Sequence, residues 1–295
     1  MNTLPYFIVN ARIGEKKIRA LQQILSGYFP DGHYPFHITQ YGGHARVLAR
    51  EAVQAEQKMI VAVGGDGTVN EVLQEIVHTQ TTLGIIPCGS GNGLARHGSI
   101  PLNMKAAVDC LFQGHDLSID IGKANDVYFI SNAGVGFDAW ICHTIRESKL
   151  RGLKMYISKV LQHYLRYTSD EYTIEYDGQI ITHKAFFLNV ANGSEFGYGF
   201  RIAPSATLQD GMLDLILVKK INVWNGFRFV WDGWNNRLHK NKNCLFVRAK
   251  SITVRGKNLH YFQTDGDTQT CDLQCLLTVQ AAALRLRVPN HMQSL

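Results

Sequence analysis

Short apolar runs alternate with amphipathic helical patterns along the first 120 residues of the chain. The apolar runs have the length expected of buried strands. We predict these strands at residues 7–10, 36–39, 59–63 and 83–87. We predict helices between them at residues 16–28, 44–57 and 69–78. Strands that alternate with helices indicate a parallel sheet covered by helices on both faces.

The pattern changes after Asp120, where strand-like runs separated by turn signals dominate. We predict strands at residues 127–132, 172–176, 185–192, 213–219, 251–255 and 276–288. Two helical stretches, near residues 149–166 and 222–238, interrupt these strands. The second part of the chain is therefore predicted to be a mostly antiparallel β domain, with the boundary near residues 122–126.

Composition and cysteine content are those of an ordinary globular protein. Hydrophobic residues make up 45% and charged residues 18% of the chain. No apolar run approaches the roughly 20 residues that span a bilayer, and the run at residues 6–9 is too short for a signal-peptide core. The six cysteines contain no C-x-x-C pair. We therefore expect reduced thiols in a cytoplasmic protein.

The net charge of +6 favours anionic partners such as nucleotides or acidic lipid head groups. The basic residues are spread along the chain and form no block of five or six like charges. Nucleic acid is therefore not expected as a partner.

A first glycine loop, Gly-Gly-Asp-Gly-Thr at residues 64–68, joins a predicted strand to a predicted helix. Glycine lets the backbone approach a phosphate closely, and the free N–H groups of a helix N-terminus favour negative charge. Asp66 would repel a phosphate, so we expect Mg²⁺ or its water shell between them. The alternative is a tight turn capped by Asp66 or Thr68. The loop matches neither the P-loop nor the Rossmann fingerprint.

A second glycine loop, at residues 87–96, follows the next predicted strand and holds three glycines in five residues, at 89, 91 and 93. Neighbouring parallel strands place both loops at the same edge of the sheet, where open α/β folds bind ligands. Two such loops about 25 residues apart are stronger evidence for phosphate binding than either loop alone.

The loops and several later segments resemble the diacylglycerol kinase catalytic family, which includes sphingosine and ceramide kinases and bacterial lipid kinases. The resemblance covers nearly the whole chain. The matching segments are residues 64–68, Thr39 with Gly43-His44-Ala45, Asn-Ala-Gly-Val-Gly-Phe-Asp at 132–138, Ala203-Pro204 with Asp-Gly-Met-Leu-Asp-Leu at 210–215, and Asp265-Gly266-Asp267. The resemblance implies an N-terminal Rossmann-like α/β nucleotide domain at residues 1–122 and a C-terminal antiparallel β-sandwich at residues 123–295. It also implies a site in the cleft between them.

The chain departs from the family pattern in three places, and the second of these departures leaves the acceptor lipid open. The chain has Asn10-Ala11-Arg12-Ile13-Gly14 where the family opens with N-P-x-S-G. Gly93 replaces an aspartate of many bacterial members, so the second loop is closer to the sphingosine and ceramide kinase version. Asp267 replaces a glutamate.

The resemblance implies an ATP-dependent kinase that transfers the γ-phosphoryl group to the hydroxyl of a diacylglycerol or sphingoid-type lipid. Asp265 is expected to be the base and Asp267 to belong to the same catalytic segment. On local sequence alone, a hairpin turn without a catalytic role is the favoured interpretation of Asp265-Gly266. The implied nucleotide-binding residues are Asn10, Thr39, Gly64, Gly65, Asp66, Gly67, Thr68, Val69, Asn70, Gly89, Ser90 and Asn92.

The resemblance implies Mg²⁺ in two places. One ion would bridge the ATP phosphates, with Asp66 and Asp120 acting through water. A separate structural ion would be bound by the Asp210 carboxylate and the carbonyls of Thr207 and Met212. The alternative for that loop is an Asp-Gly turn without metal.

The expected partners are ATP, a lipid substrate at a membrane surface, and a second copy of the chain in a homodimer. We expect a cytoplasmic protein that associates peripherally with the membrane. An NAD kinase-like enzyme shares the Gly-Gly-Asp-Gly-Thr loop and the two-domain plan, but the second loop and Asp265-Gly266-Asp267 argue against it. A non-catalytic relative that binds nucleotide or lipid is the other alternative.

Aromatic residues recur at helical spacing in the stretch at 222–238. Trp224, Phe227, Trp231, Trp234 and Leu238 fall on one face of a continuous helix. This face either packs on the β domain, or it lines the lipid entrance or enters the membrane interface, where tryptophan is favoured.

Overall fold

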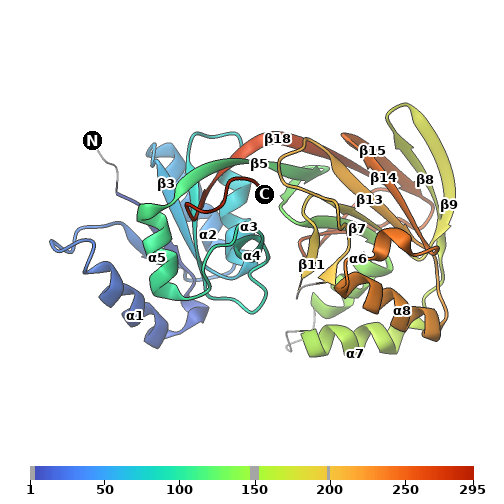
Figure 1. Ribbon diagram of the computed structural model, residues 1–295, viewed down its shortest axis with the longest axis horizontal. Coiled ribbons are helices and arrows are strands. Elements are labelled where there is room, and N and C mark those ends of the chain that lie inside the picture. The colour runs from blue at the N-terminus through green and yellow to red at the C-terminus, as the bar shows by residue number, and fades with distance from the viewer. Residues whose placement is uncertain (1–3, 147–152, 198–199) are drawn as a thin grey trace. The chain divides into compact units, whose positions relative to one another are not determined.

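The computed structural model describes residues 4–146, 153–197 and 200–295 and divides the chain into two compact units (Figure 1). Unit 1 comprises Met1–Asp120 and Ala281–Leu295, and unit 2 comprises Ile121–Gln280.

Unit 1 is built on parallel strands in the order β2-β1-β3-β4, followed by the C-terminal part of β18. These strands are β1 (Tyr6–Val9), β2 (Phe36–Ile38), β3 (Met59–Gly64), β4 (Thr82–Pro87) and β18 (Gln274–Val288). Every residue of β1, β3 and β4 is buried, as expected for strands covered on both faces. The predicted parallel α/β domain is confirmed.

Five helices accompany these strands. They are α1 (Glu15–Leu25), α2 (His44–Gln54), α3 (Asp66–Ile76), α4 (Gly93–His97) and α5 (Met104–Gln113). Apolar residues of α1 and α5 pack with β1 and β3 in one core cluster, and both helices lie on the same side of the sheet in Figure 1. The predicted helices correspond to α1, α2 and α3, whereas α4 and α5 were not predicted.

Unit 2 is a sandwich of two antiparallel sheet layers. One layer has the order β14-β13-β10-β7-β16-β17. These strands are β14 (Cys244–Ala249), β13 (Leu213–Val218), β10 (Phe187–Ala191), β7 (Asn132–Gly136), β16 (Tyr261–Thr264) and β17 (Asp267–Thr270). The other layer contains the N-terminal part of β18 with β15 (Ser251–Gly256), β8 (Asp170–Tyr176) and β9 (Gln179–Ala185).

The core of unit 2 lies between these layers. Val135, Leu188 and Phe262 from the first layer join Ile174 and Val254 from the second in one buried cluster. The predicted antiparallel β-sandwich is therefore confirmed. Two further strands, β5 (His115–Ala124) and β6 (Val127–Phe129), pair antiparallel with each other.

Three helices of unit 2 differ in part from the predicted ones. They are α6 (Phe137–Arg146), α7 (Leu153–Tyr164) and α8 (Val223–Trp234). The sequence did not predict α6, and residues 149–152 of the predicted helix at 149–166 lie outside the described residues. The helix predicted at 222–238 ends at Trp234, and the buried Leu238 belongs to a separate 3-10 turn, Leu238–Lys240. A short pair, β11 (Glu195–Gly197) and β12 (Phe200–Arg201), completes the unit.

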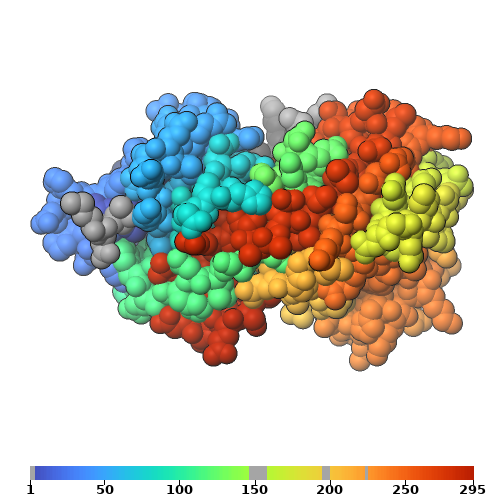
Figure 2. Space-filling view, turned by 90° about the horizontal axis from the view of Figure 1, so that it is seen from above, coloured from blue at the N-terminus to red at the C-terminus, as the bar shows by residue number. Residues whose placement is uncertain are grey.

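The C-terminal residues belong to unit 1, which differs from the predicted division of residues 1–122 and 123–295. Strand β18 pairs with β15 at Gln274–Thr278 but with β4 at Arg285 and Leu286. Between these stretches Ala282 has φ +49, and its N–H donates to Asp120 at 2.8 Å. Figure 2 shows the red C-terminal segment beside the green segment around residue 110, and Arg287 donates to the carbonyl of Gly114 at 2.8 Å. The sequence shows a single strand-like run at residues 276–288, which does not reveal this change of partner.

Candidate active site

The ends of β1, β2 and β3 are joined at the first glycine loop of unit 1. Asn10, directly after β1, donates from Nδ2 to Thr68 Oγ1 at 2.8 Å. The Thr39 hydroxyl, directly after β2, accepts the N–H of Ala11 at 3.2 Å. A side chain at Gly64 would overlap Thr68 Oγ1, so glycine is required there. These contacts bring Asn10, Thr39 and Thr68 to one edge of the sheet.

Asp66 connects the two glycine loops. Its Oδ2 accepts the N–H of Asn92 at 2.9 Å, and its Oδ1 accepts the N–H of Gly93 at 2.6 Å. A Cβ on Gly91 would lie 2.6 Å from Asp66 Oδ2, so the second loop approaches Asp66 closely. The carboxylate within the first loop therefore has protein partners of its own, and Mg²⁺ beside it remains a prediction.

The second glycine loop packs directly on the first. A Cβ on Gly89 would lie 2.5 Å from the Cα of Gly65. The Asn92 side chain closes the second loop, because its Oδ1 accepts the N–H of Gly89 and its Nδ2 donates to the Gly89 carbonyl, both at 2.9 Å. Ser90 is exposed on this loop. The prediction that both loops share one edge of the sheet is confirmed.

The remaining residues predicted to bind the nucleotide, Gly67, Val69 and Asn70, differ in their burial and in their contacts. Gly67 lies in the first turn of α3, and a Cβ there would meet nothing within 4 Å. Gly67 therefore has the ordinary φ of a helix and does not need glycine for a left-handed conformation. Val69 is buried in the core. Asn70 accepts a hydrogen bond from Gln74 at 3.1 Å.

Glu71 is a site residue that the sequence reasoning missed. Its carboxylate accepts the N–H groups of Gly43 and Ala45, both at 3.1 Å. It therefore ties the start of α2 to α3, directly behind the first glycine loop. The signal in the sequence was an acidic residue on the helix that follows the loop.

Asp265 in unit 2 occupies a hairpin turn and also holds a neighbouring segment. Asp265 and Gly266 connect β16 to β17 with φ +50 and +92, as a two-residue turn with positive φ requires. The Asp265 carboxylate accepts the N–H groups of Ile130 and Ser131 at 2.8 Å and that of Asn132 at 3.2 Å. The hairpin interpretation is thus correct for the backbone, while three N–H groups fix the position of the carboxylate.

A buried polar network lies beside this turn. Gln263 Nε2 donates to Asn132 Oδ1 and to Asp138 Oδ2, both at 2.8 Å, and Gln263 Oε1 accepts the N–H of Gly266 at 2.8 Å. Asn189, fully buried in β10, donates to Asn132 Oδ1 at 3.1 Å. Because buried polar networks rigidify their surroundings, this one fixes the turn that carries Asp265. The sequence reasoning did not select Gln263 or Asn189, although each is a polar residue in a buried strand.

Asp267 is exposed at the start of β17. Burial raises the pKa of the Cys142 thiol on α6 well above its ordinary value, and the charges of Asp138 and Asp267 raise it further. Asp267 therefore contributes negative charge on the side of the turn that α6 covers.

The loop at residues 207–212 pairs its carboxylate with a guanidinium. Asp210 forms an ion pair with Arg248 and accepts the N–H of Met212 at 3.0 Å. Arg248 also lies 3.5 Å from Asp214, a carboxyl whose pKa is raised by burial and lowered by Arg248. Thr207 is exposed at the start of this loop, and the described residues contain no group of three His, Cys, Asp or Glu arranged for a metal. Arg248 thus already supplies positive charge to the Asp210 carboxylate, and a metal held by Asp210 with the carbonyls of Thr207 and Met212 remains a prediction.

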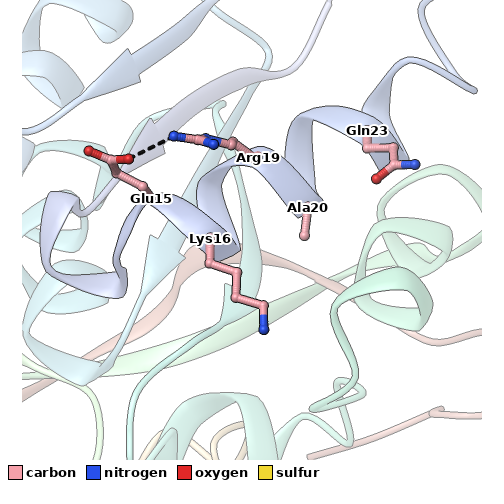
Figure 3. Close-up of a pocket in the computed structure, with 5 residues that line it drawn as sticks. All are labelled: Glu15, Lys16, Arg19, Ala20 and Gln23. Atoms are coloured by element: carbon pink, nitrogen blue, oxygen red, sulfur yellow. Dashed lines mark hydrogen bonds and ion pairs between the residues drawn. The ribbon is translucent and has the colours of Figure 1, made fainter.

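A shallow hollow elsewhere in unit 1 is lined by one helix alone. Figure 3 shows its residues on α1, with Arg19 paired to Glu15 at 2.8 Å. Because a single exposed helix face cannot enclose a ligand, we assign no site to this hollow.

Two family models match most of the chain. Residues 5–124 match the diacylglycerol kinase catalytic domain, and residues 131–288 match the YegS C-terminal NAD kinase beta sandwich-like domain. The chain is 30% identical to a diacylglycerol kinase of Bacillus subtilis (strain 168) over 254 residues, covering 84% of each chain. It is also 30% identical to a diacylglycerol kinase of Staphylococcus carnosus (strain TM300) over 239 residues, covering 78% of this chain and 77% of the relative.

Solved structures agree on the fold. A diacylglycerol kinase from Bacillus anthracis str. Sterne has a TM-score of 0.79 at 24% identity and covers 97% of each chain. An NAD kinase from Archaeoglobus fulgidus, in complex with ATP, has a TM-score of 0.55 at 14% identity and covers 96% of this chain and 93% of that one.

The fold is thus the two-domain type that these solved diacylglycerol kinase and NAD kinase structures share. The chain belongs to the diacylglycerol kinase catalytic-domain family. Among the helices that the structure describes, none combines the length and apolar character needed to cross a bilayer.

Proposed function

We propose that this protein is an ATP-dependent lipid kinase that transfers the γ-phosphoryl group to the hydroxyl of a diacylglycerol or a sphingoid-type lipid. The observation that carries the proposal is the contact between the two glycine loops at the ends of β3 and β4, which Asp66 ties together. This edge of a parallel sheet suits a polyphosphate. Membership of the diacylglycerol kinase family supports a lipid as the acceptor.

The nucleotide is proposed to bind at this edge of unit 1. Asn10, Thr39 and Thr68 would orient the phosphates, with Ser90 donating from the second loop. The backbone N–H groups of the first loop, from Gly64 to Asn70, would approach the phosphates most closely. The likeness of fold to the NAD kinase solved with ATP supports this nucleotide. Mg²⁺ accompanying ATP would neutralise charge on the phosphates.

Asp265 is proposed to accept the proton of the lipid hydroxyl. The hydroxyl oxygen forms a bond to the γ-phosphorus while the bond from that phosphorus to the β–γ bridging oxygen breaks, and the products are ADP and the lipid phosphate. The three N–H groups on the Asp265 carboxylate hold it in one orientation, which is what a positioned base requires. Asp267, two residues further on, is proposed to contribute negative charge to the same site.

A ³²P-transfer screen tests the proposal. The acceptors are diacylglycerol, monoacylglycerol, sphingosine, ceramide and phosphatidylglycerol dispersed in detergent, with NAD as the competing acceptor. We expect label in one lipid and none in NADP. Label in NADP alone would favour the NAD kinase-like alternative, and ATP binding without turnover on any acceptor would favour a non-catalytic relative.

The screen is paired with a variant of the base. Asp265→Asn should lower kcat about 10²–10⁴-fold. Asp272→Asn, which changes an exposed carboxylate of the same unit, is the matched control. Because the amide introduced by Asp265→Asn also loses one acceptor for a backbone N–H, the unfolding midpoint of each variant is measured alongside kcat. A folded Asp265→Asn variant with half the wild-type kcat would contradict the assignment.

We also propose that the protein works in the cytoplasm and reaches its lipid by peripheral association with a membrane. A homodimer remains a prediction from the resemblance.

A further inference from the structure

Helix α8 turns its most apolar face to solvent. Phe227, Trp231 and Trp234 are 68%, 63% and 55% exposed, and Val230 beside them is also exposed. At 100° per residue these four side chains fall within about one third of the helix circumference. The side chain of Trp224 lies outside the described residues. Of the two interpretations of this stripe, packing on the β domain is therefore wrong for Phe227, Trp231 and Trp234, whereas Leu238, in the 3-10 turn that follows, is buried.

The opposite face of α8 is fixed to the unit 2 core. Phe229 packs with Phe187 and Phe200 at ring-centroid distances of 6.4 and 5.8 Å. A side chain at Gly233 would overlap the Phe200 ring, and the buried Asp232 accepts a hydrogen bond from Asn241 at 2.8 Å. These contacts fix the rotation of the helix about its axis. The aromatic face is consequently held outward by the packing of the other face.

Positive charge is concentrated around this helix. Residues 219–242 contain six basic residues and one acidic residue, a net charge of +5 out of +6 for the whole chain. The basic residues are Lys219, Lys220, Arg228, Arg237, Lys240 and Lys242, and all six are exposed. The single acid, Asp232, is buried on the inner face. An exposed aromatic face flanked by basic residues is suited to an interface that carries negative charge.

Helix α7 presents further apolar surface at the same end of unit 2. Leu161 of α7 and Leu165, directly after this helix, are exposed, and the Tyr164 hydroxyl donates to the carbonyl of Ile221, two residues before α8 begins. Lys220 donates to the carbonyl of Tyr167 and so ties the two segments a second time. Figure 1 shows α7 and α8 at one end of this unit, apart from the sandwich core.

We propose that the aromatic face of α8 docks into the head-group region of a bilayer that contains anionic phospholipid. This inference rests on the proposed lipid kinase function and adds the surface by which the protein meets its substrate membrane. Tryptophan is favoured at the head-group level, where its ring is buried and its N–H stays hydrated. Lys and Arg beside the face add attraction to acidic head groups. A second copy of the chain is a poorer occupant, because a twofold contact through this face would oppose two segments of charge +5.

Co-sedimentation with vesicles tests the docking without nucleotide. The variant is Trp231→Gln, and the matched control is Ile180→Gln, since Ile180 is 67% exposed on β9 of the same unit. Vesicles are phosphatidylcholine with or without phosphatidylglycerol. We expect Trp231→Gln to bind the anionic vesicles about tenfold more weakly, and Ile180→Gln to bind like the wild type. The deficit of Trp231→Gln should persist at 1 M salt, where the Debye length is about 3 Å and the basic residues contribute little.

Three further measurements decide between outcomes. Unchanged vesicle binding by Trp231→Gln would overturn the proposal. The proposal would also be overturned if Trp231→Gln lowered the melting temperature as much as the loss of a core aromatic residue does. In that case the face would be buried in the protein in solution. If the wild type self-associates and Trp231→Gln abolishes this association, the face belongs to a dimer interface. That result would also overturn the proposal of bilayer docking. Activity on detergent-dispersed lipid should be equal in wild type and Trp231→Gln. If the wild type is inactive in that assay, the proposed kinase function fails, while the result with vesicles still stands.

Discussion

Replacing Asp66 by asparagine separates two explanations for the carboxylate inside the first glycine loop. If Asp66 serves only Mg²⁺, the variant should fold as stably as the wild type and lose only metal-dependent nucleotide binding. If Asp66 holds the second loop, as its contacts with Asn92 and Gly93 indicate, the protein without ligand should be less stable.

The size of the effect follows from these two contacts. A hydrogen bond to a charged group contributes about 1.5–3 kcal/mol, and an N–H left unpaired costs about 1–3 kcal/mol. Asparagine keeps one acceptor oxygen but turns an NH₂ toward the other N–H, so one contact is lost. Because Asp66 is exposed and water competes for the same groups, we take the lower end, a loss of about 1–2 kcal/mol.

Urea unfolding in buffer with EDTA measures this loss, with circular dichroism as the signal. Asp31→Asn is the matched control, since Asp31 is an exposed residue of the same unit whose backbone carbonyl, rather than its carboxylate, meets His33. We expect Asp66→Asn to unfold at lower urea with an unchanged slope, and Asp31→Asn to match the wild type. A loss below about 0.5 kcal/mol, within the range of ordinary surface substitutions, would refute the loop-bridging role.

Three other expectations concern the loops, the ion pair and the thiols. Gly89→Ala should weaken ATP binding at least about tenfold, because the added Cβ would meet the backbone of Gly65. Gly42→Ala, which has open space around its Cβ, should leave ATP binding unchanged, and calorimetry on both variants measures the difference. EDTA should leave the melting temperature unchanged, because Arg248 already supplies positive charge to Asp210; a fall that Mg²⁺ reverses would show that a metal is bound there. Burial raises the pKa of Cys271 from 9.0 to about 11, so at pH 8 it should carry about 100-fold less thiolate than an ordinary cysteine. Its alkylation by iodoacetamide, followed by mass spectrometry, should be slow at that pH and accelerate as pH rises toward 11; rapid labelling at pH 8 would contradict it.

The parallel sheet and the paired loops could be predicted because their signals are local. A buried strand that runs into glycines and then into a helix identifies its own glycine loop, and the order of the parallel strands placed both loops at one edge. The contacts of Asp66 could not be predicted, because its partners are backbone N–H groups 26 and 27 residues away. Almost every residue type has a backbone N–H group, so the amino-acid sequence does not reveal which of these groups will donate to a given carboxylate.

The surroundings of Asp265 were likewise hidden. Local sequence predicted the hairpin, but its carboxylate is held by N–H groups about 135 residues earlier in the chain. For α8, spacing alone identified the aromatic stripe, yet it could not say which face the core would take. Gly233 and Phe229 determine which face packs inward. The face that carries Gly233 fits against the Phe200 ring because glycine has no side chain, and Phe229 packs on the same ring.

The path of β18 has a consequence for biosynthesis. Strand β4 has β3 on one side and Arg285–Leu286 on the other, so its second edge stays open until nearly the whole chain has left the ribosome. Leu284, Leu286 and Val288 are buried in unit 1, so the nascent unit also lacks part of its interior. Unit 1, although encoded first, is then completed last. A chain that stops short of residue 284 would display an unpaired apolar strand edge, which cellular quality control can recognise.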